Sequence, residues 1–217
     1  MQQSSTPLPH EFYEQDVCDV ARALIGCLVR RHLGDGTVLS GRIVETEAYS
    51  ENEPASHSYR GKTPRNKPMF GPAGHAYVYL IYGVHECFNA VCGPTDHAHA
   101  VLIRALEPVE GIESMWTNRG GPGRARGAVD VKPRKTMTVR DLASGPGKLC
   151  QALQITRQDV NGTSLISGPV TIHEGPRPSG ILTGPRIGIS IASDLRWRFA
   201  EAGSRFVSRP VKDLSPG

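Results

Sequence analysis

Two glutamates, Glu45 and Glu47, are spaced for chemistry in the strand-like stretch RIVETEAYS. Side chains two residues apart on a strand share a face, which would place the two carboxylates roughly 6–7 Å apart. Such a separation falls near the range of inverting glycoside hydrolysis, in which one carboxylate activates water and the other protonates the leaving group. The commoner outcome for such a pair is two solvated glutamates on an exposed strand face.

Three further polar residues could serve a binding pocket. Arg104 stands inside the apolar stretch AVLIRAL, where an arginine must be paired or face a cleft, because burying an unpaired charge is very costly. A structural salt bridge and a role in a site are both compatible with this position. Asn89 could read the polar edge of a ligand or tie a turn. His57 lies in a polar loop, where it is either a surface residue or orients a substrate or a water.

Three tyrosines fall within six residues of the stretch AYVYLIYGVHECFNAV, residues 76–91. Strand formers dominate the stretch and Tyr82-Gly83 interrupts it, which predicts a β-hairpin with a tight turn. Tyr77 and Tyr79 would then share one face of a strand, with Tyr82 near the hairpin tip. A core strand with an aromatic face would show the same sequence pattern.

The charge of the chain favours a polyanionic partner. The formal net charge is +4 and the pI is about 8.9. Residues 119–141 hold seven Arg or Lys against two Asp, which suits either phosphate contact or a solvated surface. Lys148 stands just inside a predicted helix start, where a cation and free backbone N–H groups together could contact phosphate.

No common metal motif is present in the sequence. The segment with His85, Cys87, Cys92, His97 and His99 has neither HExxH nor CxxC spacing, so we expect no metal and no cofactor. The five cysteines form no CxxC pair and the start shows no signal peptide, which favours free thiols in a cytoplasmic protein. No apolar run reaches about 18 residues, so no membrane span is expected.

The predicted elements indicate an α+β fold. Strands and helices do not alternate as βαβ units, which favours an antiparallel or mixed sheet with helices packed around it. The length of 217 residues suits a flexible arm over 1–14 and a single domain over 15–217. Helices are predicted from Gln15 towards Gly26, after Pro108 and within 144–155, and strands over 38–48, 99–108 and 186–191.

Seven motifs, in order, resemble the alkyladenine (3-methyladenine) DNA glycosylase family. They are GRIVETEAY (41–49), ASHS (55–58), TPRNKPMF (63–70), HAYVYLIYG (75–83), CFNAV (87–91), VLIRALEP (101–108) and SGPGKLCQAL (144–153). They cover most of residues 15–155, and the C-terminal third fits more loosely. Each motif alone is weak, but seven in the family's order are highly specific.

The resemblance implies a fold and a catalytic group. The fold is one compact mixed α/β domain with a curved antiparallel sheet, surrounding helices and a protruding hairpin that inserts into DNA. Tyr82 would enter the duplex and fill the gap left by a flipped nucleotide. Glu47 would be the general base that activates water.

The resemblance also implies a pocket for the extruded base. Tyr49, His57 and Tyr79 would line it and stack on the base. Asn89 would crowd the amino group of normal guanine and so help to reject it. Arg104 would hold a phosphate of the flipped nucleotide.

The implied activity is that of a monofunctional DNA glycosylase, a monomer that acts on damaged purines in double-stranded DNA during base excision repair. No lysine lies in the motifs expected to line the pocket, so a Schiff base and strand cleavage are not expected. The preferred lesion stays open between 3-methyladenine, 7-methylguanine, hypoxanthine and ethenoadenine. The main alternative is a non-catalytic damaged-DNA-binding protein with the same wedge and pocket. A domain like the C-terminal part of methionyl-tRNA formyltransferase, and a glycosidase of sugars, fit less well.

Overall fold

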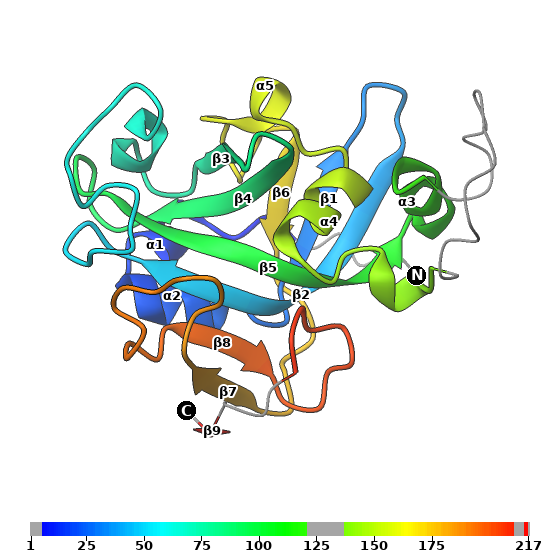
Figure 1. Ribbon diagram of the computed structural model, residues 1–217. Helices are drawn as coiled ribbons and strands as arrows, with labels where there is room; N and C mark the ends of the chain where they lie inside the picture. The colour runs from blue at the N-terminus through cyan, green and yellow to red at the C-terminus, as the bar shows by residue number, and fades with distance from the viewer. Residues whose placement is uncertain (1–5, 121–136, 211–214, 217) are drawn as a thin grey trace.

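One curved sheet organises the protein, whose structure is a computed structural model that describes residues 6–120, 137–210 and 215–216 (Figure 1). Within these ranges nine strands form a single sheet, and every strand pair runs antiparallel. The strand order is β3-β4-β5-β2-β8-β7-β9, and β1 joins β2 to β6. The strands are β1 (Leu28–His32), β2 (Val38–Tyr49), β3 (Ala76–Ile81), β4 (His85–Cys92), β5 (His99–Glu110), β6 (Val170–His173), β7 (Ile181–Gly184), β8 (Arg198–Glu201) and β9 (Ser215–Pro216).

Short helices surround the sheet. Among them α2 packs on β2 and β5, and α4 packs on β4 and β5. None of the helices in the described ranges has the length and apolar character needed to cross a bilayer. The helices are α1 (His10–Tyr13), α2 (Val17–Ala23), α3 (Ile112–Asn118), α4 (Pro146–Ala152) and α5 (Arg157–Val160), with 3-10 helices η1 (Lys67–Phe70) and η2 (Val139–Asp141).

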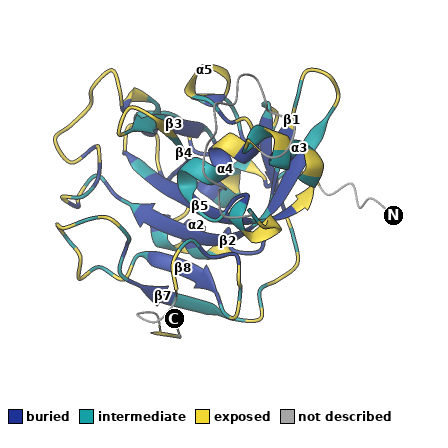
Figure 2. Cartoon of the chain, turned by 45° about the vertical axis from the view of Figure 1, so that its right-hand side comes forward, coloured by how far each residue is buried: buried dark blue, intermediate teal, exposed yellow. Residues whose placement is uncertain are grey.

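The long central strand β2 explains the curvature. Its first half pairs with β1 and its second half with β8, while β5 runs along its other edge. The pairing with β5 shifts register on both sides of Glu45, and such bulges bend a strand and increase its twist. Figure 2 shows β5, β2 and β8 largely buried. The expected curved antiparallel sheet with surrounding helices is thus confirmed.

The predicted hairpin is formed by β3 and β4. The N–H of Val84 donates to the Ile81 carbonyl over 3.2 Å, and both intervening residues have positive φ, 53° at Tyr82 and 71° at Gly83. This is the pattern of a type I′ turn, whose twist matches that of the flanking strands. The Tyr82 side chain stands at the tip and is 84% exposed.

The prediction that a helix starts at Pro108 is wrong. Strand β5 continues to Glu110, with Pro108 paired opposite Gly41, and α3 begins only at Ile112. Gly111 ends the strand with a φ of 72°, and a Cβ there would lie 2.5 Å from the Leu39 side chain. The strand is therefore ended by glycine rather than by proline.

One other expectation also fails. Residues 186–191 form no strand, and the backbone N–H of Ile187 donates to the buried Glu47 carboxylate instead of to a neighbouring strand. Within the predicted arm over 1–14, residues 10–13 form α1. Leu8 and Tyr13 are buried in the main core, and the Leu8 N–H donates to Ile172, so burial of apolar surface holds this segment. Residues 1–5 lie outside the described ranges.

Candidate active site

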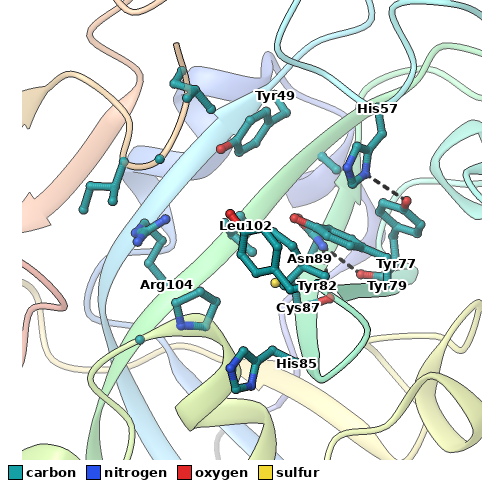
Figure 3. A pocket seen from close by; sticks show the side chains of 18 of the residues that line it. Tyr49, His57, Tyr77, Tyr79, Tyr82, His85, Cys87, Asn89, Leu102 and Arg104 are labelled. Atoms are coloured by element: carbon teal, nitrogen blue, oxygen red, sulfur yellow. Dashed lines mark hydrogen bonds between the residues drawn. The ribbon is translucent and has the colours of Figure 1, made fainter.

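A pocket of about 570 Å³ opens between the hairpin, β5 and the start of α4 (Figure 3). Alternation along the first half of β5 turns Leu102 and Arg104 into this pocket and Val101 and Ile103 into the core. Of the residues expected at the site, all except Glu47 line the pocket, namely Tyr49, His57, Tyr79, Tyr82, Asn89, Arg104 and Lys148.

Glu47 lies directly behind the pocket wall and is fully buried. Its Oε2 accepts hydrogen bonds from the Tyr49 hydroxyl at 2.8 Å and from Nη1 of Arg104 at 3.0 Å. Its Oε1 accepts the backbone N–H of Ile187 at 2.7 Å. All three donor residues line the pocket, so the carboxylate lies within hydrogen-bond distance of groups that form the pocket wall.

The environment of Glu47 favours a proton-accepting carboxylate. Burial raises its pKa above the ordinary value of 4.5, because a charged carboxylate loses hydration inside the protein. The Arg104 cation and the donors from Ile187 and Tyr49 oppose this rise. A carboxylate of raised pKa is a stronger base than an exposed one and is therefore well suited to take a proton from water.

Glu45 has a different role from Glu47, and neither is the solvated surface residue that the strand pattern made the commoner outcome. Glu45 is fully buried and accepts from Nε of Arg198 at 2.7 Å and from the N–H and hydroxyl of Ser208 at 2.6 and 3.0 Å. Arg104 lies between the two carboxylates, 3.4 Å from Glu45 and 3.0 Å from Glu47. Glu45 therefore anchors the arginine that contacts Glu47, and its oxygens are occupied by structural donors.

Aromatic side chains form one wall of the pocket. The Tyr79 and His57 rings meet edge to face with centroids 4.4 Å apart, and the Tyr77 ring lies 5.4 Å from Tyr79. The Tyr77 hydroxyl lies 3.2 Å from Nδ1 of His57 and so helps to fix the imidazole (Figure 3). Burial, assisted by the Arg65 cation, lowers the pKa of His57 and keeps the ring neutral near neutral pH. The wall thus offers uncharged ring faces to a planar ligand.

Asn89 is rigidly held in the pocket floor. It is buried, and its Nδ2 donates to the carbonyl of Tyr77 at 2.9 Å and to that of Cys87 at 3.3 Å. Both carbonyls belong to the hairpin strands, so the amide cannot rotate without losing these bonds. Its position is therefore fixed before any ligand enters.

Cations gather at the side of the pocket next to α4. Lys148 lines the pocket and its Nζ donates to the Ser144 hydroxyl at 3.3 Å. This corrects the expectation that no lysine would line the pocket. Arg119 also lines it and donates to Gln151. Most of the basic stretch 119–141 lies outside the described residues.

The sequence reading missed Arg186, which holds the pocket wall in place. Its guanidinium forms a buried bidentate pair with Glu53 at 2.7 and 2.9 Å and donates to the Ala48 carbonyl at 2.9 Å. It also stacks on the Tyr49 ring, 4.6 Å from its centroid. The neighbouring Ile187 N–H is thereby brought to Glu47. An arginine inside the strand-like motif GPRIGI was the available signal, by the same reasoning that was applied to Arg104.

Replacing Arg186 with Met should lower the free energy of unfolding by about 3–5 kcal/mol, because Glu53 would be left as a buried carboxylate without its cation. Urea unfolding of the purified protein measures this. Arg177→Met, at an exposed position, should have little effect, and adding Glu53→Leu to Arg186→Met should restore much of the loss. Equal stability of Arg186→Met and wild type would show that the pair does not hold the wall.

Comparison with known proteins agrees with this architecture. The family model "Methylpurine-DNA glycosylase (MPG)" matches residues 11–205. Proteins named "Putative 3-methyladenine DNA glycosylase" are similar over nearly their whole length. That of Methanoculleus marisnigri is 48% identical, covering 93% of this chain and 98% of its own, and that of Agrobacterium fabrum is 47% identical, covering 96% of each. This chain belongs to the methylpurine-DNA glycosylase family.

Proposed function

We propose that this protein is a monofunctional glycosylase that takes a damaged purine out of double-stranded DNA into the pocket and hydrolyses its N-glycosidic bond. The observation that carries the proposal is the Glu47 carboxylate, buried behind an aromatic pocket and held by donors from Tyr49, Arg104 and Ile187. Excision of this kind would begin base excision repair.

Base extrusion follows from where the reacting bond lies. The stacked duplex hides the N-glycosidic bond, so the nucleotide must leave the stack at a cost of a few kcal/mol. Stacking on the Tyr79 wall can return roughly 1–3 kcal/mol per base. Such a wall favours electron-poor purines, because a cationic alkylpurine is attracted by the face of a tyrosine ring.

Tyr82 is suited to keep the base extruded. A non-glycine residue with positive φ costs on the order of 1–3 kcal/mol, and such strain persists at functional positions. At Tyr82 the strain presents a large apolar ring almost entirely to solvent. Inserted between bases, that ring would fill the vacated space and slow the return of the nucleotide.

The proposed reaction is hydrolysis. A carboxylate has about four acceptor positions, and three of those on Glu47 are taken, which leaves one on Oε1 for a water. Glu47 accepts a proton from that water while the oxygen of the water bonds to C1′ of the sugar. The N-glycosidic electrons leave with the purine, and the carboxylate stabilises the cationic sugar in the transition state.

Two more groups complete the proposal. The fixed Asn89 amide would crowd the exocyclic amino group of guanine and so disfavour the undamaged base. Arg104 has five N–H donors, of which Glu47 and Ser208 engage two, so others are left for a phosphate of the flipped nucleotide. Lys148 would supply a second phosphate contact.

Glu47→Gln should reduce single-turnover release of 3-methyladenine from duplex DNA by at least about 100-fold, because the amide cannot accept the proton from water. Lesion binding should be retained. Release is followed with a labelled duplex, and hypoxanthine and ethenoadenine duplexes, run in parallel, report the lesion range. The product strand should stay intact until alkali is added, since water and not Lys148 is the proposed nucleophile.

The exposed Glu110→Gln is the matched control and should react like wild type. Tight lesion binding with no release by wild type would identify a damage-binding protein and would refute the hydrolase. Strand breaks without alkali that vanish in Lys148→Met would refute the monofunctional assignment.

Excision should also depend on pH through Glu47. Its ionised form is the active one, so the rate should rise as pH rises through a pKa that burial holds above 4.5. A duplex with 7-methylguanine isolates this limb, because the cationic base needs no protonation to leave. A rate that stays flat from neutral pH down to pH 4.5 would contradict the raised pKa.

Tyr82→Ala should weaken retention of the flipped base by about tenfold or more, in line with the loss of roughly 1–3 kcal/mol of stacking. Stopped-flow fluorescence of an ethenoadenine duplex follows base extrusion and return. Tyr59→Ala, which removes another exposed tyrosine, is the control and should leave retention unchanged.

The strain at the tip allows a sharper version of this test. Tyr82→Asn suits the left-handed conformation, so this variant should be at least as stable as wild type but should still lose retention. Unchanged retention in both Tyr82 variants would exclude the wedge.

A further inference from the structure

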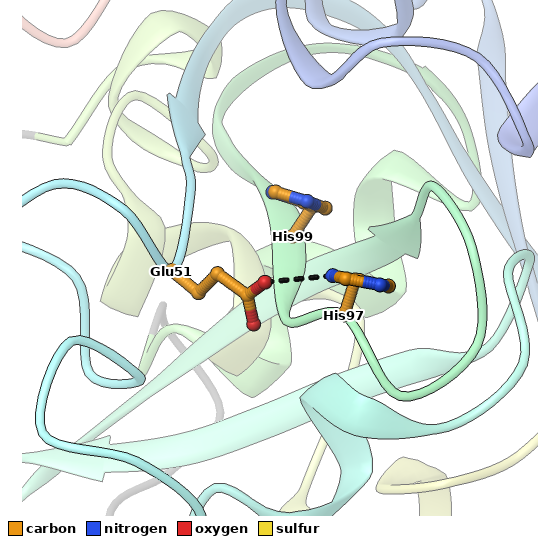
Figure 4. Close-up of side chains that lie close together, drawn as sticks. All are labelled: Glu51, His97 and His99. Carbon is orange, nitrogen blue, oxygen red and sulfur yellow. Dashed lines mark hydrogen bonds and ion pairs between the residues drawn. The ribbon is translucent and has the colours of Figure 1, made fainter.

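A second polar cluster lies away from the pocket and consists of Glu51, His97 and His99 (Figure 4). One potential ligand atom from each residue lies within 4.8 Å of the other two. None of the three lines the pocket, and His99 has the β5 parity of the core residue Val101. The cluster therefore has no part in the chemistry assigned to Glu47.

The carboxylate of Glu51 is held between the end of β2 and the start of β5. Its Oε1 lies 2.8 Å from Nδ1 of His97, and its Oε2 accepts the Ala98 N–H at 2.9 Å. The His97 and His99 rings are parallel within 7°, with centroids 6.4 Å apart. Nδ1 of His99 is buried and has no hydrogen-bond partner among the described residues. The protein thus holds the Glu51 carboxylate in place, while Nδ1 of His99 bonds to no described residue.

We propose that Glu51, His97 and His99 bind one divalent transition-metal ion, for which Zn²⁺ is the best match, with water completing its coordination. Two imidazoles and one carboxylate form a known donor set for zinc, whereas Mg²⁺ and Ca²⁺ prefer oxygen donors alone. With bonds of about 2.0–2.2 Å, tetrahedral ligand atoms lie roughly 3.3–3.5 Å apart. The half-exposed His97 can close the remaining distance by rotation of its side chain.

Nitrogen atoms of the two histidines are available to a metal ion. No described residue forms a hydrogen bond with Nδ1 of His99. The ion would replace the proton shared by His97 and Glu51, and that proton would move to the other ring nitrogen or to solvent.

The position of the cluster defines what the ion would do. Glu51 lies at the start of the loop after β2, and the same loop carries His57 of the pocket. The loop also contacts the start of β5 through the Ser58 hydroxyl, which lies 3.3 Å from the Ala98 carbonyl, and through Met69, which packs with Ala98 and Ala100. A bound ion would cross-link the loop to β5 and stabilise it from outside the pocket.

The pair HAH at 97–99 was visible in the sequence, but its third member was not. Glu51 lies 46 residues before His97, and only the folding of the loop against β5 brings them together. A search for local zinc spacings cannot find such a set.

The test uses metal-free, full-length protein without a histidine tag. Calorimetric titration with Zn²⁺ should show one equivalent bound, and Co²⁺ should give the visible absorption of a four-coordinate nitrogen–oxygen site. His97→Gln and Glu51→Gln should each bind at least tenfold more weakly, in keeping with the loss of one ligand. Glu51→Gln keeps an oxygen for the Ala98 N–H, and His97 is well exposed, so both variants should fold.

His10→Gln is the matched control. His10 pairs with the exposed Glu14 at 3.3 Å, and among the described residues the two belong to no cluster of three potential ligands, so the loss of His10 should leave metal binding unchanged. Zn²⁺ should raise the melting temperature of wild type and His10→Gln but not that of His97→Gln. Glu47→Gln should bind Zn²⁺ like wild type, which separates this result from the glycosylase assignment.

Three outcomes would overturn the proposal. They are the absence of one bound equivalent in wild type, binding by His97→Gln as tight as that by His10→Gln, and a thiolate charge-transfer band with Co²⁺. The last would assign binding to one of the five free cysteines instead.

Discussion

The candidate site depends on one constraint, which is the need to compensate a fully buried carboxylate. An unpaired charge in the interior is very costly, so Glu47 can be buried only if donors reach both of its oxygens. The donors come from β2, from β5 and from the segment after β7. Three parts of the chain that are distant in sequence are therefore held in a fixed relation by a single acceptor.

The requirement extends outward from Glu47 through its neighbours. Arg104 contacts both Glu47 and Glu45, and Glu45 is in turn satisfied by Arg198 and Ser208. On the other side, Arg186 pairs with Glu53 and packs on the ring of the tyrosine that donates to Glu47. The sheet, the long loop and the C-terminal segment thus share one buried ionic network, and the pocket is the space left in front of it.

The sequence could predict the parts of this arrangement that rest on local pattern. Alternation and turn chemistry were enough for the Tyr82 hairpin and the long strands β2 and β5. Local pattern could not predict that Glu45 and Glu47 are buried, because burial depends on cations supplied from about 60 to 150 residues away. The same limit applies to 186–191, where the buried Glu47 carboxylate accepts the backbone N–H of Ile187, which the apolar pattern assigns to a strand.

The burial of this network separates two responses to ionic strength. Dissolved ions screen charges in water over about 10 Å at 0.1 M salt, but they act weakly on pairs enclosed by protein. Contacts with the phosphates of DNA exchange directly with dissolved cations and weaken steeply as salt rises. Salt should therefore govern how long the protein stays on a duplex while leaving the geometry around Glu47 unchanged. Salt concentration would then tune the time spent on DNA, whereas pH, acting through Glu47, would tune the reactivity within the pocket.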